Sequence, residues 1–204
     1  GAKAEMGDVE RPGGLRDAQG KGEGAEGYGL GFGEALHVLF ERSVQRRREA
    51  PMPPPAQIEA TLEAHMDEEH MDGPTDTDIQ RARGMLRRFL ESDLWKEIGA
   101  AEAAYTEHPV ASLIAGDGAE RPVPELRRGT IDLVYRGPGG WVVVDFKTDR
   151  VGPEANLAAA LEDHPYANQV RAYRDAFTRA TGAPVAKAGL WFADAGEFVA
   201  VGTG

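Results

Sequence analysis

The residues best suited to chemistry are two carboxylates and one ammonium, Asp132, Asp145 and Lys147, within residues 129–149, GTIDLVYRGPGGWVVVDFKTD. This stretch reads as two short apolar strands joined by a Gly/Pro turn, with Asp132 on the first strand and Asp145 and Lys147 ending the second. Residues two apart in a strand point to the same face, so Asp145 and Lys147 project together, and Asp132 can lie beside them if the strands pair. Such a group at the end of a buried strand suits a divalent metal ion that activates water against a phosphodiester.

Composition and length bound the kinds of protein that could carry these groups. The chain has 204 residues, 41% of them hydrophobic, which is enough for one sizeable core. It contains no cysteine, which excludes disulfides, cysteine zinc sites and thiol catalysis and fits a reducing cytoplasm. No apolar run is long enough to span a bilayer and no signal-peptide pattern is present, so we expect a cytoplasmic protein without a membrane role.

The net charge of −11 is distributed unevenly along the chain. Residues 1–120 hold 13 Lys and Arg against 24 Asp and Glu, whereas residues 121–204 hold 10 of each. All of the excess acid therefore lies in the half without the Asp-x-Lys pair, and a divalent ion would add positive charge where a phosphate must sit. Basic residues form only short patches rather than a stripe, so we expect weak affinity for nucleic acid when the chain is isolated.

The elements that must position these groups follow from composition and hydrophobic spacing. Residues 1–27 are rich in Gly and charged residues and are expected to form a flexible arm or linker. Residues 28–204 are expected to form a single domain, mainly helical at 28–104 and with a sheet core at 105–204. Residues 28–33, YGLGFG, read as a glycine-rich turn.

Helices and strands then alternate in a mixed order. Asp76 or Asp78 is expected to cap one helix, 115–128 to be a polar connection, and 151–165 to be a loop or short helix. The order of elements predicts an α/β core with a mixed sheet. Helices are expected at 34–48, 58–66, 79–92, 93–104 and 166–181, and strands at 104–114, 130–135, 141–146, 186–192 and 197–201.

Further polar residues line up with the strand pair. Gly33 and His37 lie four apart on the first expected helix. Gln169 and Tyr173 lie four apart on the last one, which places them on one helix face. Glu107 lies on the first expected strand.

Taken together, these residues resemble the RecB-like nucleases of the PD-(D/E)XK superfamily, and most of all the C-terminal nuclease domain of AddA-type helicase–nucleases. The family pattern is a G-x-x-x-H helix, a G-x-x-D strand, a D-(Y/F)-K-T strand and a Q-x-x-x-Y helix, in this order. The resemblance covers about residues 28–201 and implies an α/β PD-(D/E)XK fold, with a central mixed sheet of about five strands flanked by helices and an N-terminal helical segment. The matching positions here are Gly33 and His37, Gly129 and Asp132, Asp145, Phe146, Lys147 and Thr148, and Gln169 and Tyr173.

The resemblance also implies a metal site. His37, Asp132 and Asp145 would ligate a divalent cation, with the backbone carbonyl of Phe146 as a further oxygen ligand. The family's metal is normally Mg²⁺, with Mn²⁺ as a substitute. Carboxylate and carbonyl oxygens suit magnesium, while imidazole is less usual for it and tolerates manganese.

The remaining residues receive roles in catalysis from the same resemblance. Lys147 would orient or deprotonate the attacking water and steady the phosphate. Because it lies beside two carboxylates it should stay charged, which favours electrostatic stabilisation over general-base work. Gln169 and Tyr173 would shape the site or contact DNA, and the family's first-strand acid corresponds to Glu107. The implied reaction is phosphodiester hydrolysis that leaves a 5′-phosphate and a 3′-hydroxyl.

The implied partners are DNA, a covalently linked helicase domain and a second protein of the helicase–nuclease, acting in double-strand-break repair and recombination. The chain has no P-loop G-x-x-x-x-G-K-[ST], so it carries no helicase motor, and without cysteines it has no ligands for an iron–sulfur cluster. Two alternatives stay open: a catalytically silent fold that clamps DNA or a partner protein, and a stand-alone exonuclease or restriction-type endonuclease of the same superfamily. The start GAKAEM, without an initial methionine, favours an excised domain over a stand-alone enzyme.

Overall fold

The computed structural model describes residues 29–66, 73–114, 125–152, 156–161 and 164–202. Its centre is a five-stranded sheet in the order β1-β2-β3-β4-β5. Only β3 and β4 are parallel, and the other neighbours are antiparallel, so the sheet is mixed as expected. The strands are β1 (Ala103–Ile114), β2 (Glu125–Gly137), β3 (Gly140–Lys147), β4 (Val185–Phe192) and β5 (Glu197–Ala200).

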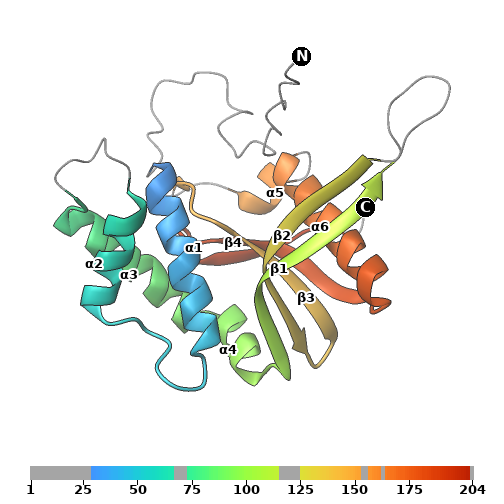
Figure 1. The fold of residues 1–204 in the computed structure, drawn as a ribbon, viewed down its shortest axis with the longest axis horizontal. Coiled ribbons are helices and arrows are strands. Elements are labelled where there is room, and N and C mark those ends of the chain that lie inside the picture. The colour runs from blue at the N-terminus through green and yellow to red at the C-terminus, as the bar shows by residue number, and fades with distance from the viewer. Residues whose placement is uncertain (1–28, 67–72, 115–124, 153–155, 162–163, 203–204) are drawn as a thin grey trace, which may run out of the picture.

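Helices cover both faces of this sheet (Figure 1). Along β3, Val142 and Val144 pack into the core under the first four helices, while Val143 packs into the core under the last two. The continuous β-branched run therefore marks a strand covered on both faces, as expected. One face carries α1 (Leu30–Gln45), α2 (Pro55–His65), α3 (Asp76–Glu91) and α4 (Asp93–Ala100), and the other carries α5 (Leu157–Leu161) and α6 (Pro165–Thr181).

The expected glycine-rich turn at residues 28–33 is wrong, because helix α1 already begins at Leu30. A Cβ atom on Gly31 would lie 2.0 Å from the backbone oxygen of His65 at the end of α2. One on Gly33 would lie 2.9 Å from Thr148 Oγ1. These glycines permit close packing of a helix rather than a turn, and sequence spacing alone does not separate the two uses of glycine.

Two other helix boundaries differ from the expectation. The N-cap of α3 is Thr75 rather than Asp76 or Asp78, and its hydroxyl accepts a hydrogen bond from Asp78 N at 3.2 Å. Asp78 Oδ2 in turn accepts one from Thr75 N at 3.1 Å, which completes a capping box. Helix α2 begins at Pro55, three residues before the expected start, because proline is well suited to the first turn of a helix.

The region between the helices and the sheet also differs. Helix α4 ends at Ala100 instead of continuing to 104. Glu102 N donates to Arg136 O of β2 at 3.1 Å, and β1 begins at the next residue, Ala103. Residues 125–128, expected in a polar connection, extend β2 and pair with β1 from Arg128–Ala111 to Glu125–Ile114. Backbone pairing between β1 and β2 thus includes residues 125–128, whose polarity favoured a loop.

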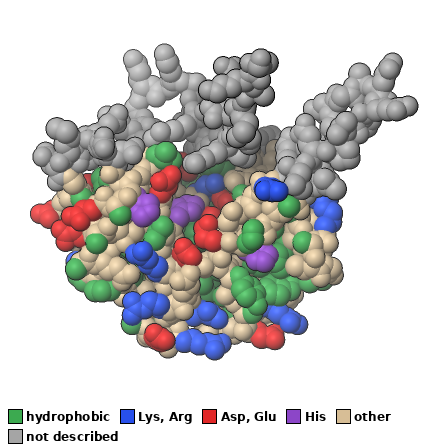
Figure 2. All heavy atoms as spheres, in the orientation of Figure 1, with side chains coloured by type: hydrophobic (Ala, Val, Ile, Leu, Met, Phe, Trp, Pro, Cys, Tyr) green, Lys and Arg blue, Asp and Glu red, His purple; other side chains and the backbone are tan. Residues whose placement is uncertain are grey.

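The surface charge follows the uneven charge of the sequence. On the face shown in Figure 2, acidic side chains gather at the left edge, where α2 and α3 lie in Figure 1, and Lys and Arg gather along the lower part. Within the part of the chain that the structure describes, no helix combines the length and the apolar character needed to cross a membrane. The expected arm at 1–27 lies outside the described residues, and the domain division at residue 28 stays a prediction.

Candidate active site

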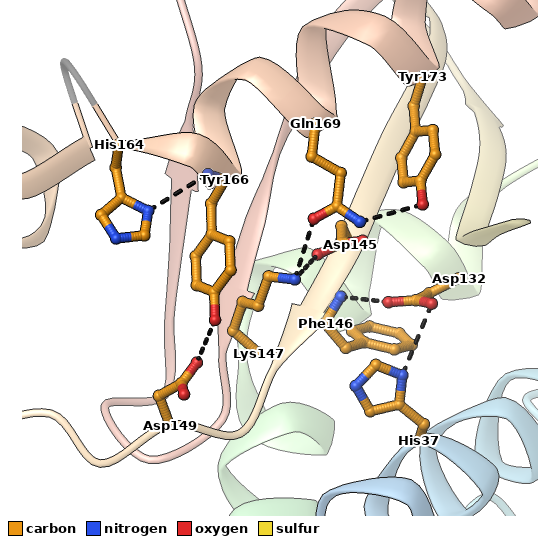
Figure 3. A network of polar contacts seen from close by, with 10 residues as sticks. All are labelled: His37, Asp132, Asp145, Phe146, Lys147, Asp149, His164, Tyr166, Gln169 and Tyr173. Carbon is orange, nitrogen blue, oxygen red and sulfur yellow. Dashed lines mark hydrogen bonds and ion pairs between the residues drawn. The ribbon is translucent and has the colours of Figure 1, made fainter. Parts of the chain in front are cut away.

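The sheet opens between β2 and β3 where the expected acids lie. The two strands pair from Gly137–Gly140 to Leu133–Val144, whereas β1 pairs with β2 well beyond that point. Asp132 is the next residue of β2 beyond the Leu133–Val144 pair, and its Oδ2 accepts a hydrogen bond from the backbone N of Phe146 at 2.6 Å. A side chain here replaces the backbone partner that a continuing ladder would supply, and side chains from both helical layers converge on this opening (Figure 3).

Asp145 and Lys147 form the buried centre of the site. Asp145 is the only buried charged residue among those the structure describes, and its Oδ2 lies 2.7 Å from Lys147 Nζ. Lys147 Nζ also donates to Gln169 Oε1 at 3.2 Å, and Gln169 Nε2 donates to the Tyr173 hydroxyl at 3.1 Å. The two residues expected to share a face of α6 therefore reach β3 as a hydrogen-bonded chain that ends on the lysine (Figure 3).

His37 reaches the same opening from the other side of the sheet. Its Nδ1 lies 3.6 Å from Asp132 Oδ1, and its ring meets the Phe146 ring edge-on with centroids 5.9 Å apart. The Phe146 ring is packed in the core under the first four helices. The His37 ring is therefore positioned by contact with a buried core side chain. His37 of α1, Asp132 of β2 and Phe146 of β3 are thus brought together.

The glycines of the expected motifs have structural roles at this site. A Cβ atom on Gly129 would lie 2.9 Å from Tyr173 Cε1, so the bare backbone of β2 makes room for the tyrosine of α6. Gly33 does the same for Thr148, which directly follows Lys147, and so lets α1 approach the end of β3. Each glycine lets one layer approach the site closely.

Glu107 lies at the margin of the site rather than in its centre. Its neighbours Thr106 and His108 pair with Leu133 and Ile131, so the register places Glu107 opposite Asp132. Its φ of 49° is left-handed, a conformation that costs free energy in a residue other than glycine. The expected strand location of Glu107 is correct, and its strained backbone lies opposite Asp132.

Burial and charge shift the titration of four groups here. Burial and the Asp132 charge raise the pKa of Asp145 to about 6, against the opposing charge of Lys147. Burial lowers the pKa of His37, but its contact with Asp132 and the charges of Asp132 and Asp145 outweigh that effect and leave it raised.

Glu107 and Tyr173 are shifted in the same direction. Partial burial and the charges of Asp132 and Glu41 raise the pKa of Glu107. Burial raises the pKa of Tyr173 to about 12, so it enters the site as a neutral hydroxyl. All four of these groups therefore bind their protons more tightly than usual, because they are buried or partly buried beside other carboxylates.

A family model described as the PD-(D/E)XK nuclease superfamily matches residues 11–201, which is most of the chain. This chain belongs to the PD-(D/E)XK nuclease superfamily. The match confirms the family inferred from the four motifs, and the mixed sheet with flanking helices is consistent with that superfamily's fold.

Curated relatives of this superfamily member match it over about half of its length. ATP-dependent helicase/nuclease proteins of the AddA type are 35% identical over 127 residues in Geobacillus kaustophilus and 30% identical over 125 residues in Geobacillus thermodenitrificans. The protein of the same name in Levilactobacillus brevis is 31% identical over 125 residues. These matches cover 57%, 55% and 57% of this chain, but only 10% of each relative.

The donor types of a divalent-metal site are present in this nuclease-superfamily chain, although they are not assembled around one point. Within the described ranges, no three His, Cys, Asp or Glu side chains are grouped so that they could hold a metal ion. Imidazole and carboxylate groups nevertheless converge, and they suit manganese or magnesium. Asp145 Oδ2 is buried and, apart from its ion pair with Lys147, accepts no hydrogen bond among the described residues. That oxygen therefore fits a cation in its chemistry.

The structure adds Tyr166, which is not among the residues of the expected motifs. Lys147 Nζ lies 4.0 Å above the centre of its ring, and its hydroxyl donates to Asp149 Oδ2 at 3.1 Å (Figure 3). Tyr166 lies in the first turn of α6, three residues before Gln169, which is the one sequence signal that it shares a helix face with the expected motif. It completes the surroundings of the lysine.

Proposed function

We propose that this chain is a divalent-metal-dependent DNA nuclease. The observation that carries the proposal is that Lys147, Asp145 and Asp132 converge where the sheet opens between β2 and β3. The superfamily to which the chain belongs is named for nucleases. Buried carboxylates beside a lysine provide ligands for a cation and a positive charge for a phosphate. The cofactor is Mg²⁺, with Mn²⁺ as a substitute.

His37, Asp132 and Asp145 would hold the metal ion, with the Phe146 carbonyl as a further ligand. The bound ion supplies Lewis-acid stabilisation of the phosphate and a water of lowered pKa. Lys147 steadies the negative charge that develops on the phosphate, because its ammonium is held by Asp145 and Gln169 at 2.7 and 3.2 Å. Glu107 adds a carboxylate opposite Asp132.

The reaction is hydrolysis of a phosphodiester. The oxygen of water forms a bond to phosphorus, the bond from phosphorus to the 3′ oxygen breaks, and the proton lost by the water is balanced by the proton that the 3′ oxygen gains. The products are a 5′-phosphate and a 3′-hydroxyl. Gln169 and Tyr173 shape the wall of the site, and Tyr173 acts there as a neutral hydrogen-bonding group.

We further propose that the chain is the nuclease module of a helicase–nuclease. Support comes from the relatives named as ATP-dependent helicase/nuclease proteins, of whose length the chain spans about a tenth. Its partners would then be DNA, a helicase domain in the same polypeptide and a second protein of the helicase–nuclease. The role would be in double-strand-break repair and recombination in the cytoplasm.

Cleavage of labelled linear DNA tests the nuclease proposal. Single- and double-stranded substrates are incubated with Mg²⁺, Mn²⁺ or chelator, with Lys147→Ala beside the parent chain. We expect metal-dependent cutting that the variant loses. A folded parent chain that binds Mn²⁺ but cuts neither substrate, alone or joined to a helicase portion, would instead favour the silent clamp.

The stand-alone alternatives are separated by the products. An exonuclease releases short products from DNA ends and leaves a closed circle intact, whereas a restriction-type endonuclease cuts the circle. Comparing linear and circular substrates in the same assay therefore assigns the mode of cleavage.

A further inference from the structure

Four aromatic side chains form a cluster away from the lysine, between β1, β3 and α6. Tyr105 lies nearly parallel to Trp141, with ring centroids 6.2 Å apart and an angle of 29° between the planes. Phe177 lies 5.3 Å from Trp141 and 5.6 Å from His108, and His108 lies 6.3 Å from Tyr105, so each ring touches two others. We call these four residues the aromatic platform.

The platform has a buried floor and an exposed top. Phe177 is 2% exposed and belongs to the core under α6, whereas Tyr105 is 52% exposed. Tyr105 is one of only three large hydrophobic residues exposed within the described ranges, the others being Leu30 and Met52. Figure 2 shows a broad hydrophobic patch with a histidine at its border, over the part of the molecule where β1 and β3 lie in Figure 1.

Two elements connect the platform to the candidate active site. On α6, Gln169, Tyr173 and Phe177 succeed one another at intervals of four, so they form one ridge about 12 Å long from the lysine's partner to the platform floor. On β1, Tyr105 precedes Glu107 by two residues, a distance of about 7 Å along a strand. A DNA strand whose phosphate lies at Lys147 therefore reaches the platform within a few nucleotides.

A basic side chain lies at the edge of the platform. Arg136 pairs with Trp141 across β2 and β3, so the two side chains share a face of the sheet. Its ion pair with Glu102, at 3.4 Å, is exposed on both sides and contributes little in water. An exposed ring with a cation beside it matches the recurring arrangement of single-strand binding, in which bases stack and phosphates meet arginine.

We propose that the aromatic platform binds a base of the single-stranded DNA that enters the active site, by stacking on Tyr105. This rests on the proposed nuclease function and specifies its substrate as a strand with unpaired bases. Duplex DNA does not offer a free base face, so the platform favours single strands. Trp141 and His108 flank the Tyr105 ring, and both rest on the buried Phe177. These contacts hold Tyr105 in place, so less conformational entropy is lost when a base stacks on it.

Equilibrium binding in chelator tests the platform without cleavage. Fluorescence anisotropy is measured for a short oligothymidylate and for an oligomer of equal length made of abasic sites, which carries the same phosphates without bases. Tyr105→Leu keeps an apolar cover but lacks an aromatic face, Tyr105→Phe keeps the ring, and Met52→Ala is the control for losing an exposed hydrophobic side chain elsewhere.

We expect oligothymidylate to bind at least about fivefold more tightly than the abasic oligomer to the parent chain, to Tyr105→Phe and to Met52→Ala. In Tyr105→Leu this preference should largely disappear, while binding of the abasic oligomer stays unchanged. Quenching of Trp141 fluorescence, taken as the difference between the parent chain and Trp141→Phe, should accompany oligothymidylate alone.

An equal preference for bases in the parent chain and in Tyr105→Leu would contradict base stacking on the platform. Contact with another protein would then be the remaining explanation for the exposed ring. If such a chain still cuts DNA in a metal-dependent way, the nuclease proposal stands. A parent chain that binds neither oligomer and cuts no DNA contradicts both proposals.

Discussion

At the scale of single residues, the site depends on where one lysine ammonium is held. Lys147 Nζ is placed by a carboxylate at 2.7 Å, an amide oxygen at 3.2 Å and an aromatic ring at 4.0 Å. Its side chain is 14% exposed, so water can replace few of these contacts. Each partner comes from a residue whose type suits a cation: carboxylate, amide oxygen and aromatic face.

Replacing Lys147 with alanine should lower the rate of DNA cleavage about 100- to 1000-fold, because a positive charge aimed at the developing phosphate charge is lost. Binding of Mn²⁺, measured by calorimetry, should be retained since the carboxylates remain. Lys96→Ala is the matched control, because that lysine is exposed and pairs with the exposed Asp93. Cleavage by Lys147→Ala at the parent rate would remove the lysine from the mechanism.

Metal affinity should depend on pH through Asp145 and His37. Both have a raised pKa, Asp145 at about 6, so both hold protons at acid pH and a metal ion must displace them. The sign is therefore a loss of affinity as the pH falls from about 7.5 to about 5, with proton release on binding. Titration with Mn²⁺ in two buffers of different ionisation enthalpy measures both quantities. Affinity that is constant over this range would show that neither group is a ligand.

At the scale of elements, the site exists because three close approaches bring two helical layers to one strand end. Gly33 admits Thr148, Gly129 admits Tyr173, and the first turn of α6 places Tyr166 below the lysine. None of these contacts lies within a single element. They explain why residues far apart in sequence act on the same few atoms.

Tyr166 should position Lys147 through its ring rather than through its hydroxyl. Tyr166→Phe keeps the ring near Nζ and loses the hydroxyl that bonds to Asp149, so its kcat should stay close to that of the parent chain. Tyr166→Leu removes the ring as well and should lower kcat about 2- to 30-fold with little change in KM, the range of a partly buried cation–π contact. Equal kcat values for the leucine and phenylalanine variants would assign the tyrosine to packing alone.

Close packing of α1 on α2 should make Gly31 intolerant of any side chain. A Cβ there would meet backbone atoms of His65 and Met66, which cannot move aside as a flexible side chain can. Gly31→Ala should therefore lower the free energy of unfolding by about 2 kcal/mol or more in urea denaturation. Gly99→Ala, on α4 with nothing within 4 Å of the new Cβ, should instead raise it by up to about 1 kcal/mol. Equal effects at the two positions would contradict the packing shown by the structure.

At the scale of the whole molecule, the net charge of −11 opposes binding to DNA, because both carry negative charge. The excess acid lies in residues 1–120, which hold the helical layer and the first strand, whereas the strands and helix with the Asp-x-Lys and Gln-x-x-x-Tyr motifs are neutral overall. Attraction to a phosphate would therefore be local to the candidate site and to the cation proposed there.

The isolated chain should bind DNA weakly and with a shallow dependence on salt. Few phosphates are neutralised by this surface, so few counterions are released, and the slope of log affinity against log salt should be small. Joining the chain to a helicase portion should raise the affinity and steepen the slope, both measured by anisotropy on one oligonucleotide. Tight, steeply salt-dependent binding by the isolated chain would contradict this view of its charge.

Several features of the fold and the site were determined by the sequence alone. The period of two along a strand put Asp145 and Lys147 on one face, and the period of 3.6 put Gln169 and Tyr173 on one face, because both patterns are local consequences of backbone geometry. The β-branched run at 142–144 predicted a strand buried on both faces. The order of elements likewise favoured a mixed sheet, which the structure confirms.

Only the tertiary structure decided what meets at the site. The pairing of β2 with β3 ends at Leu133–Val144, and His37 and Gln169 approach the opening from opposite layers. Tyr166 lies beneath the lysine. All of these features depend on how the layers pack. The glycines of α1 show the physical reason. A glycine that allows a turn and a glycine that allows a neighbour to approach look the same in sequence, since the neighbour exists only once the chain has folded.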